Sequence, residues 1–154
     1  MSDNHAPEIV TLEPRPVALL RETVRMDALT AYYDRAFHTV MSTVGAQGVS
    51  IAGPPVGVYY GMPSETVDVA AGFPTDRPIA PDAGVTPETL PGGRAAQILH
   101  VGSYDALQET YGRLQQWLGE QGLTPGPVMW ETYLTEPDDA HPEATQTLIV
   151  WPLA

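Results

Sequence analysis

Apolar residues in the first half of the chain recur with the periods of strands and of one helix. The apolar, branched run Val17 to Val24 is typical of a strand. A helix is predicted next, because apolar residues then recur every three or four positions, at Leu29, Tyr33, Phe37, Val40 and Val44. Two further short apolar runs predict strands at Val56 to Tyr60 and Thr66 to Phe73.

The second half repeats this order of strand, helix, strand and strand. The first strand is predicted at Arg94 to Val101, with Ser103 as a helix N-cap. Helical spacing follows, and the last two strands are predicted at Val128 to Leu134 and Thr145 to Trp151. The apolar face of this helix comprises Tyr104, Leu107, Tyr111, Leu114 and Leu118.

Short matching segments support a duplication. Gly45-Ala46-Gln47-Gly48-Val49 matches Gly119-Glu120-Gln121-Gly122-Leu123, and each pair of glycines is expected to end a helix. Gly53-Pro54-Pro55-Val56 likewise matches Gly126-Pro127-Val128. We therefore expect an α+β fold of tandem duplicated β-α-β-β units, related by a pseudo-two-fold axis, with antiparallel sheet and a ligand cleft between the halves.

The domain boundaries follow from the same pattern. The length of 154 residues fits a single domain covering residues 1–154. Its first half is placed at about residues 8–74 and its second half at about residues 93–153. The segment between them, about residues 75–92, contains several prolines and is predicted to be a loop or linker.

Composition excludes several classes of function. The net charge is -12 with only seven basic residues, which argues against nucleic acid as a partner. There is no cysteine, and the four histidines lack metal-ligand spacing, so neither a metal nor another cofactor is expected. No apolar run is long enough to span a membrane, and no signal-peptide pattern opens the chain, so a cytoplasmic location is expected.

The candidate site centres on Glu131 in the strand predicted at Val128 to Leu134. Alternation places Met129, Glu131 and Tyr133 on one face, and Val128, Trp130 and Thr132 on the other. The repeat aligns Tyr59 with Glu131. We expect the apolar, branched faces to cover the helices, which leaves Glu131 and Tyr59 to meet across the two-fold axis.

These residue types favour a planar, apolar or cationic ligand. Aromatic rings attract cations, a sheltered carboxylate adds charge pairing, and the Met129 thioether supplies an adaptable wall. Trp130 and Trp151 are further candidate ligand contacts, although core packing also explains Trp151. The alternative for Glu131 is a solvated side chain on the outer face of its strand. His100, at the end of a predicted strand, is a candidate acid or base.

A family resemblance agrees with this interpretation. His100-Val101-Gly102-Ser103-Tyr104, Trp117-Leu118, Trp130-Glu131-Thr132-Tyr133 and Trp151-Pro152 together resemble the GyrI-like effector-binding domain, also called the bacterial transcription-activator effector-binding domain. Ser103 departs from the proline that the family commonly has. The resemblance implies a tandem strand-helix-strand-strand fold, here as a stand-alone member, with Glu131 as the buried acid that recognises cationic, aromatic drugs.

Three hypotheses follow from the residues and the resemblance. The first is a module that binds small aromatic or cationic molecules for sensing, sequestration or resistance. The second is a hydrolase of reactive cyclopropane-bearing natural products, in which Glu131 activates water and Tyr133 or Tyr59 polarises the substrate. The third is a protein-interaction module of the gyrase-inhibitor type, acting through the acidic surface.

Overall fold

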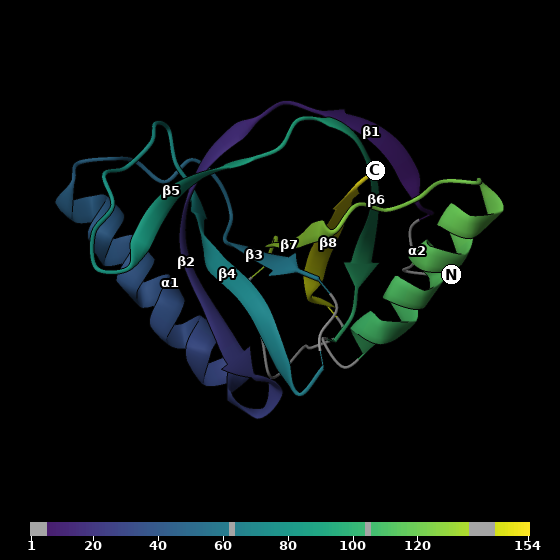
Figure 1. Cartoon of the computed structure of the whole chain (residues 1–154), viewed down its shortest axis with the longest axis horizontal. Helices are drawn as coiled ribbons and strands as arrows, with labels where there is room; N and C mark the ends of the chain where they lie inside the picture. Colours follow the sequence, from purple (N-terminus) through teal and green to yellow (C-terminus); the bar gives the residue numbers. More distant parts are fainter. Residues whose placement is uncertain (1–5, 62–63, 104–105, 136–143) are drawn as a thin grey trace. The chain divides into compact units, whose positions relative to one another are not determined.

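The computed structural model describes residues 6–61, 64–103, 106–135 and 144–154 (Figure 1). It has the predicted α+β class, with antiparallel strand pairs throughout and two α-helices in the described part of the chain. The chain forms two compact units. Unit 1 comprises Met1–Leu12 and Gly93–Ala154, and unit 2 comprises Glu13–Gly92.

Unit 2 contains one long α-helix and a sheet with the strand order β3-β4-β2-β5. Its elements agree with the predicted strand, helix, strand and strand, extended by one more strand. In chain order they are β2 (Arg15–Arg25), a short 3-10 helix η1 (Met26–Ala28), α1 (Leu29–Ala46), β3 (Val56–Tyr60), β4 (Thr66–Pro74) and β5 (Val85–Leu90).

Unit 1 has a sheet with the strand order β1-β6-β8-β7 and a shorter α-helix. Its elements again contain the predicted strand, helix, strand and strand, with one strand added from the N-terminal segment. They are β1 (Glu8–Leu12), β6 (Gly93–Val101), α2 (Leu107–Glu120), β7 (Val128–Tyr133) and β8 (Gln146–Pro152).

The segment predicted to be a linker is partly a strand. Strand β5 lies within it and pairs with β2, with Pro87 opposite Ala18. The prediction of a loop was wrong here because proline is tolerated on an edge strand, where one side of the backbone needs no ladder hydrogen bond. Strand β1 was not predicted either, and it pairs with β6, far away in the sequence.

The two helices end in the same way, as the paired glycines predicted. Gly48 and Gly122 each have a φ of 68°, a conformation that costs glycine little. The residue after each glycine donates its N–H to a carbonyl in the last turn of the helix. Val49 N donates to Val44 O at 3.2 Å, and Leu123 N donates to Leu118 O at 2.9 Å.

Helix α1 packs on unit 2 with Val40 and Val44 buried as predicted, but the buried face of its first half is shifted by one residue. Tyr32, Ala36 and Val40 are almost fully buried, whereas Tyr33 and Phe37 are only partly buried beside them. The hydroxyl of Tyr32 donates to the carbonyl of Leu20 on β2 and accepts the N–H of Ala71 on β4 at 2.9 Å. Burial raises the pKa of Tyr32 to about 12.

Helix α2 buries a narrower stripe on unit 1. Thr110, Leu114 and Leu118 are the buried positions, spaced by one helical turn each. Helix α2 begins after Ala106 and not after Ser103, so the prediction of Ser103 as its N-cap was wrong. Tyr104, predicted on the apolar face, lies outside the described residues.

Candidate functional site

Glu131 is a buried carboxylate in the middle of β7. Only 5% of its surface is exposed. It lies opposite Ile149 on β8, which in turn lies opposite Ile98 on β6, so these side chains share one face of the sheet. The prediction of a strand with Glu131 sheltered from water therefore agrees with the structure of unit 1.

Both oxygens of the Glu131 carboxylate accept hydrogen bonds from tyrosine hydroxyls. Tyr133, two residues further along β7, donates to Oε1 at 2.8 Å. Tyr111, on helix α2, donates to Oε2. The Tyr111 hydroxyl also lies 3.7 Å from Sδ of Met129, which is the residue two positions before Glu131 on the same face.

This arrangement favours a negative charge at a sheltered point. A buried carboxylate is costly unless it is hydrogen-bonded, and hydroxyl donors stabilise its ionised form. The tyrosine rings around it are apolar surfaces whose faces attract cations. The group of Glu131, Tyr111, Tyr133 and Met129 (hereafter the Glu131 cluster) therefore combines a sheltered carboxyl group with aromatic and thioether walls.

The helices cover the opposite strand faces from those predicted. Glu131 lies on the face of its sheet that carries α2, because Tyr111 reaches it from that helix. In unit 2, Tyr59 likewise lies on the α1 side, where its hydroxyl and that of Tyr33 are 2.5 Å apart. The prediction failed because it assumed that a helix covers only an aliphatic face of a sheet. A helix can also cover a face with polar groups when tyrosines on the helix hydrogen-bond to them, as Tyr111 and Tyr33 do here.

The structure brings together only some of the predicted site residues. Met129 and Tyr133 lie beside Glu131, as predicted. Trp130 is buried on the other face of β7, opposite Val150. Trp151 is half-buried, and its Nε1 donates to the carbonyl of Gly126 at 2.9 Å. Tyr59 belongs to unit 2, and its meeting with Glu131 stays a prediction.

Tyr111 is the residue of the Glu131 cluster that the sequence did not reveal. Its helical spacing with Leu107 and Leu114 predicted a core residue, and the structure leaves it half-buried beside the buried stripe. The available signal was its polar tip, since a tyrosine on an apolar helix face needs a hydrogen-bond partner. Nothing in the local sequence identifies that partner as Glu131.

His100 has both ring nitrogens engaged. It is 2% exposed, with Nδ1 2.6 Å from Oγ1 of Thr110 and Nε2 2.8 Å from the carbonyl of Ser103. A histidine held in this way links β6 to helix α2, which differs from the role of acid or base considered from the sequence.

One buried hydroxyl of this face is unsatisfied. Thr147 on β8 lies between His100 and Tyr133 in the strand register. Among the described residues its Oγ1 has no hydrogen-bond partner, and its side chain is 0% exposed. An orphan hydroxyl lowers stability, because its desolvation is not offset.

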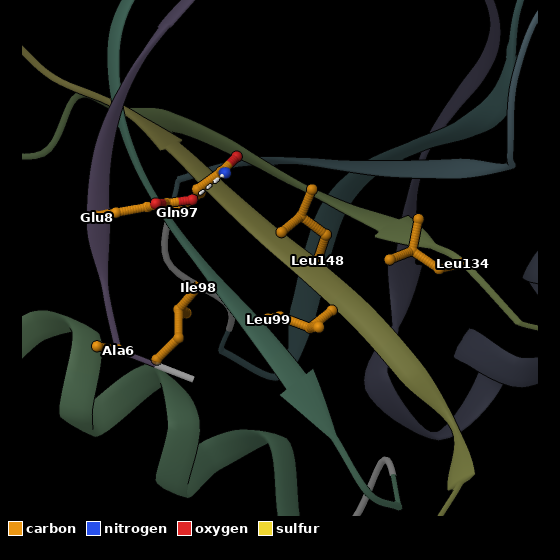
Figure 2. Close-up of a pocket in the computed structure, with 7 residues that line it drawn as sticks. All are labelled: Ala6, Glu8, Gln97, Ile98, Leu99, Leu134 and Leu148. Atoms are coloured by element: carbon orange, nitrogen blue, oxygen red, sulfur yellow. Dashed lines mark hydrogen bonds between the residues drawn. The ribbon is translucent and has the colours of Figure 1, made fainter. Parts of the chain in front are cut away.

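Unit 1 also has a surface hollow that is separate from the Glu131 cluster. The hollow, whose lining residues are labelled in Figure 2, has a volume of about 350 Å³. Gln97 Nε2 donates to Oε1 of Glu8 at its edge, at 2.7 Å. Its lining contains no member of the Glu131 cluster, and consists of Ala6, Glu8, Gln97, Ile98, Leu99, Leu134 and Leu148.

The described part of the chain contains neither a cluster of metal ligands nor a helix that could span a membrane. No group of three or more His, Cys, Asp or Glu side chains is placed to hold a metal ion there. Within the same residues, neither helix has the length and apolar character needed to cross a bilayer.

Solved structures of low sequence identity share this fold. The EcmrR C-terminal domain superposes with a TM-score of 0.84 at 16% identity, covering 99% of both chains. Against EcmrR in its DNA complex the TM-score is 0.85 at 18% identity, and 96% of this chain spans 57% of that one.

Two further structures are similar over most of their length. SAV2435 bound to tetraphenylphosphonium has a TM-score of 0.69 at 14% identity, covering 97% of this chain and 94% of that one. A hydrolase from Listeria innocua has a TM-score of 0.66 at 15% identity, covering 96% and 91%.

The sequence itself gives the family. No functionally curated protein matches the chain. The family model described as the GyrI-like small molecule binding domain matches residues 5–154. With nearly the whole sequence matched, the chain belongs to the GyrI-like small molecule binding domain family.

Proposed function

We propose that this protein binds small aromatic or cationic molecules, such as drugs or natural products, and that the Glu131 carboxylate provides the charge that attracts them. The observation that carries the proposal is the sheltered carboxylate held by two tyrosine hydroxyls. Its membership of a small-molecule-binding family supports binding as the activity.

The geometry favours cations that present no strong hydrogen-bond donors. Both carboxylate oxygens already accept a tyrosine hydroxyl, so a ligand gains most from the electric field of the charge and from contact with the rings. Lipophilic cations with the charge buried among aromatic groups match this environment. SAV2435, which has a similar fold, was solved with such a cation, tetraphenylphosphonium.

We assign different roles to the remaining candidates. Met129 forms an adaptable wall beside Glu131, which suits a tolerant pocket. Tyr59 and Trp151 are proposed as further ligand contacts, because their aromatic rings offer surfaces that attract cations. Trp130 lies on the face of β7 opposite to Glu131, so its fluorescence serves as a nearby reporter of ligand binding.

Titration with tetraphenylphosphonium, followed by tryptophan fluorescence and by calorimetry, tests the proposal. Glu131→Gln keeps the shape of the side chain and removes its charge. Breaking a desolvated charge pair costs about 2–5 kcal/mol, so the dissociation constant of this variant is expected to rise by roughly 30-fold or more. Glu120→Gln is the matched control, because it removes the same charge from an exposed position at the end of α2.

Two results would contradict the proposal. If wild-type protein does not bind tetraphenylphosphonium or other aromatic cations, the protein is not a binder of this class. If Glu131→Gln and Glu120→Gln bind as tightly as wild type, the sheltered charge plays no part in recognition.

Hydrolysis of a reactive cyclopropane-bearing molecule is the second candidate function. The observation that favours it is the Tyr133 hydroxyl 2.8 Å from the Glu131 carboxylate, which places a base and a polarising phenol side by side. Glu131 would accept a proton from the attacking water as its oxygen bonds to a cyclopropane carbon, the strained C–C bond would break, and the Tyr133 hydroxyl would hydrogen-bond to the acceptor group of the substrate that takes up the electron pair. Mass spectrometry detects the ring-opened product, and turnover is expected to be lost in Glu131→Gln and Tyr133→Phe. Absence of product with wild-type protein argues for binding alone.

A further inference from the structure

We infer that His100 and Thr110 are positioning residues for the proposed ligand site: their hydrogen bond fixes helix α2 in the rotation that places the Tyr111 hydroxyl on Glu131. The inference rests on the proposed function, since it assigns the residues that keep the Glu131 cluster in a binding geometry. It concerns residues that do not touch the carboxylate themselves.

The hydrogen-bond network defines the tautomer of a neutral His100 ring. A carbonyl oxygen only accepts, so Nε2 carries a proton and donates to Ser103 O. In the neutral ring Nδ1 is then an acceptor, and the Thr110 hydroxyl donates to it. His100 thus ties the end of β6 both to the turn that follows it and to the first turns of α2.

Thr110 and Tyr111 point in different directions because they are successive helical residues. Side chains of neighbouring positions project about 100° apart around a helix. Thr110 belongs to the buried stripe with Leu114 and Leu118, which are 0% and 1% exposed. Tyr111 projects beside this stripe and reaches Glu131 on β7, two strands away from β6 in the sheet of unit 1.

The polar link at Thr110 constrains the helix in a way that the leucines do not. Burial of Leu114 and Leu118 holds α2 against the sheet, but hydrophobic contact is non-directional. A hydrogen bond weakens steeply when its angle changes. The His100–Thr110 bond therefore resists rotation of α2 next to Tyr111. Arg113 brings a charged group to this bond, with Nη2 3.4 Å from the Thr110 hydroxyl.

Valine and serine substitutions at Thr110 distinguish the effect of the hydroxyl on binding from the effect of side-chain shape, because valine keeps the shape and serine keeps the hydroxyl. With tetraphenylphosphonium as probe, Thr110→Val is expected to weaken binding about fivefold to tenfold, the effect of losing one net hydrogen bond. Thr110→Ser keeps the hydroxyl and is expected to bind like wild type. In a Tyr111→Phe background Thr110→Val should have little further effect, because its influence passes through the missing hydroxyl.

Thr43→Val is the matched control for loss of a buried threonine hydroxyl. Thr43 is 6% exposed and lies on α1 in unit 2. Urea unfolding establishes that all variants are folded under the titration conditions. Equal binding by folded Thr110→Val and wild type, or an effect of Thr110→Val that is fully additive with Tyr111→Phe, would overturn the inference.

A spectroscopic measurement keeps this test independent of the ligand. Fluorine NMR of protein labelled with 3-fluorotyrosine reports the environment of each ring, and Tyr111→Phe identifies the Tyr111 signal by its loss. Thr110→Val is expected to shift that signal, while Thr110→Ser and Thr43→Val leave it in place. An unmoved signal in Thr110→Val refutes the positioning role even if tetraphenylphosphonium does not bind, a result that would count separately against the proposed function.

Discussion

The two units have corresponding strand orders, but the sheet faces covered by their helices bear different polar groups. In unit 1 a tyrosine of α2 meets a buried carboxylate, Glu131. In unit 2 the corresponding contact joins two neutral phenols, Tyr33 of α1 and Tyr59 of β3. A charge at this depth requires donors of its own, whereas neutral aromatic rings are stabilised by burial and by one another.

The aromatic residues of unit 2 form a continuous cluster. The rings of Tyr33 and Phe37 are stacked with centroids 5.6 Å apart, and Phe37 meets Phe73 edge-on at 5.6 Å. The ring centroids of Tyr32 and Tyr33 are 5.5 Å apart. This contrast teaches that one topology supports a packed aromatic core in one unit and a face with a buried carboxyl group in the other. The same contrast can be tested by changing single groups in each unit.

The largest expected effect concerns Tyr32 in unit 2. Its folded pKa of about 12 lies above the usual value of about 10, so the stability it contributes is complete below pH 10 and is lost as the pH rises towards 12. The loss is on the order of 2–3 kcal/mol. Urea unfolding at pH 8, 10 and 12 measures it. Tyr32→Phe should show a smaller alkaline loss than Tyr33→Phe, and equal losses would show that Tyr32 is not the titrating group.

The next effect separates charged from neutral hydrogen bonds. Tyr111→Phe removes a donor to the Glu131 carboxylate and is expected to lower the free energy of unfolding by about 1.5–3 kcal/mol. Tyr33→Phe removes a bond between two phenols and is expected to cost about 0.5–1.5 kcal/mol. Urea denaturation at neutral pH compares them. If Tyr33→Phe costs as much as Tyr111→Phe, the contrast between the two faces is not one of charge.

Removing an unsatisfied buried hydroxyl is expected to stabilise both units by a similar, smaller amount. Among the described residues, the hydroxyls of Thr147 in unit 1 and Thr75 in unit 2 are buried without a hydrogen-bond partner. Valine has the same shape without the hydroxyl, so Thr147→Val and Thr75→Val should each raise the free energy of unfolding by about 1 kcal/mol. Thermal unfolding detects the gain. Destabilisation by Thr147→Val alone would mean that its hydroxyl is satisfied in solution, by water or by a ligand.

The smallest effect lies at an ion pair on unit 2. Arg21 donates to both oxygens of Asp68, at 2.9 and 2.7 Å, and its guanidinium lies 3.7 Å from the Tyr60 ring centroid. The hydrogen bond from Arg21 lowers the pKa of Asp68. The ion pair therefore stabilises the fold above the unfolded pKa of about 4, and this stabilisation is lost as the pH falls through the pKa of folded Asp68. The side chains of Arg21 and Asp68 are 54% and 34% exposed, and solvent screening limits the contribution to about 0.2–1 kcal/mol.

Comparison of wild type with Asp68→Asn at two pH values tests this sign. At pH 7 the variant should be slightly less stable to urea, and at pH 2 the difference should close because the carboxyl group of wild type is protonated. A difference that persists unchanged in acid would mean that the ion pair is not its source.

Local sequence was sufficient for most of the elements. Helices α1 and α2, their ends at Gly48 and Gly122, and strand β7 around Glu131 were all predicted, because periodicity and glycine backbone preferences are properties of neighbouring residues. The family was also recognisable from residues spread along the chain. The duplication and its two-fold axis stay predictions, although the strand orders of the two units correspond.

The pairing of distant segments was decided only by the tertiary structure. Strand β1 precedes β2 in the chain but pairs with β6, and β5 precedes β6 but pairs with β2. The covered face of each sheet was also not predictable, since alternation sorts side chains into two faces without saying which one a helix will occupy. Tyr111 meets Glu131 for the same reason: the sequence determines that each needs a polar partner, and packing of α2 on unit 1 selects which partner it finds.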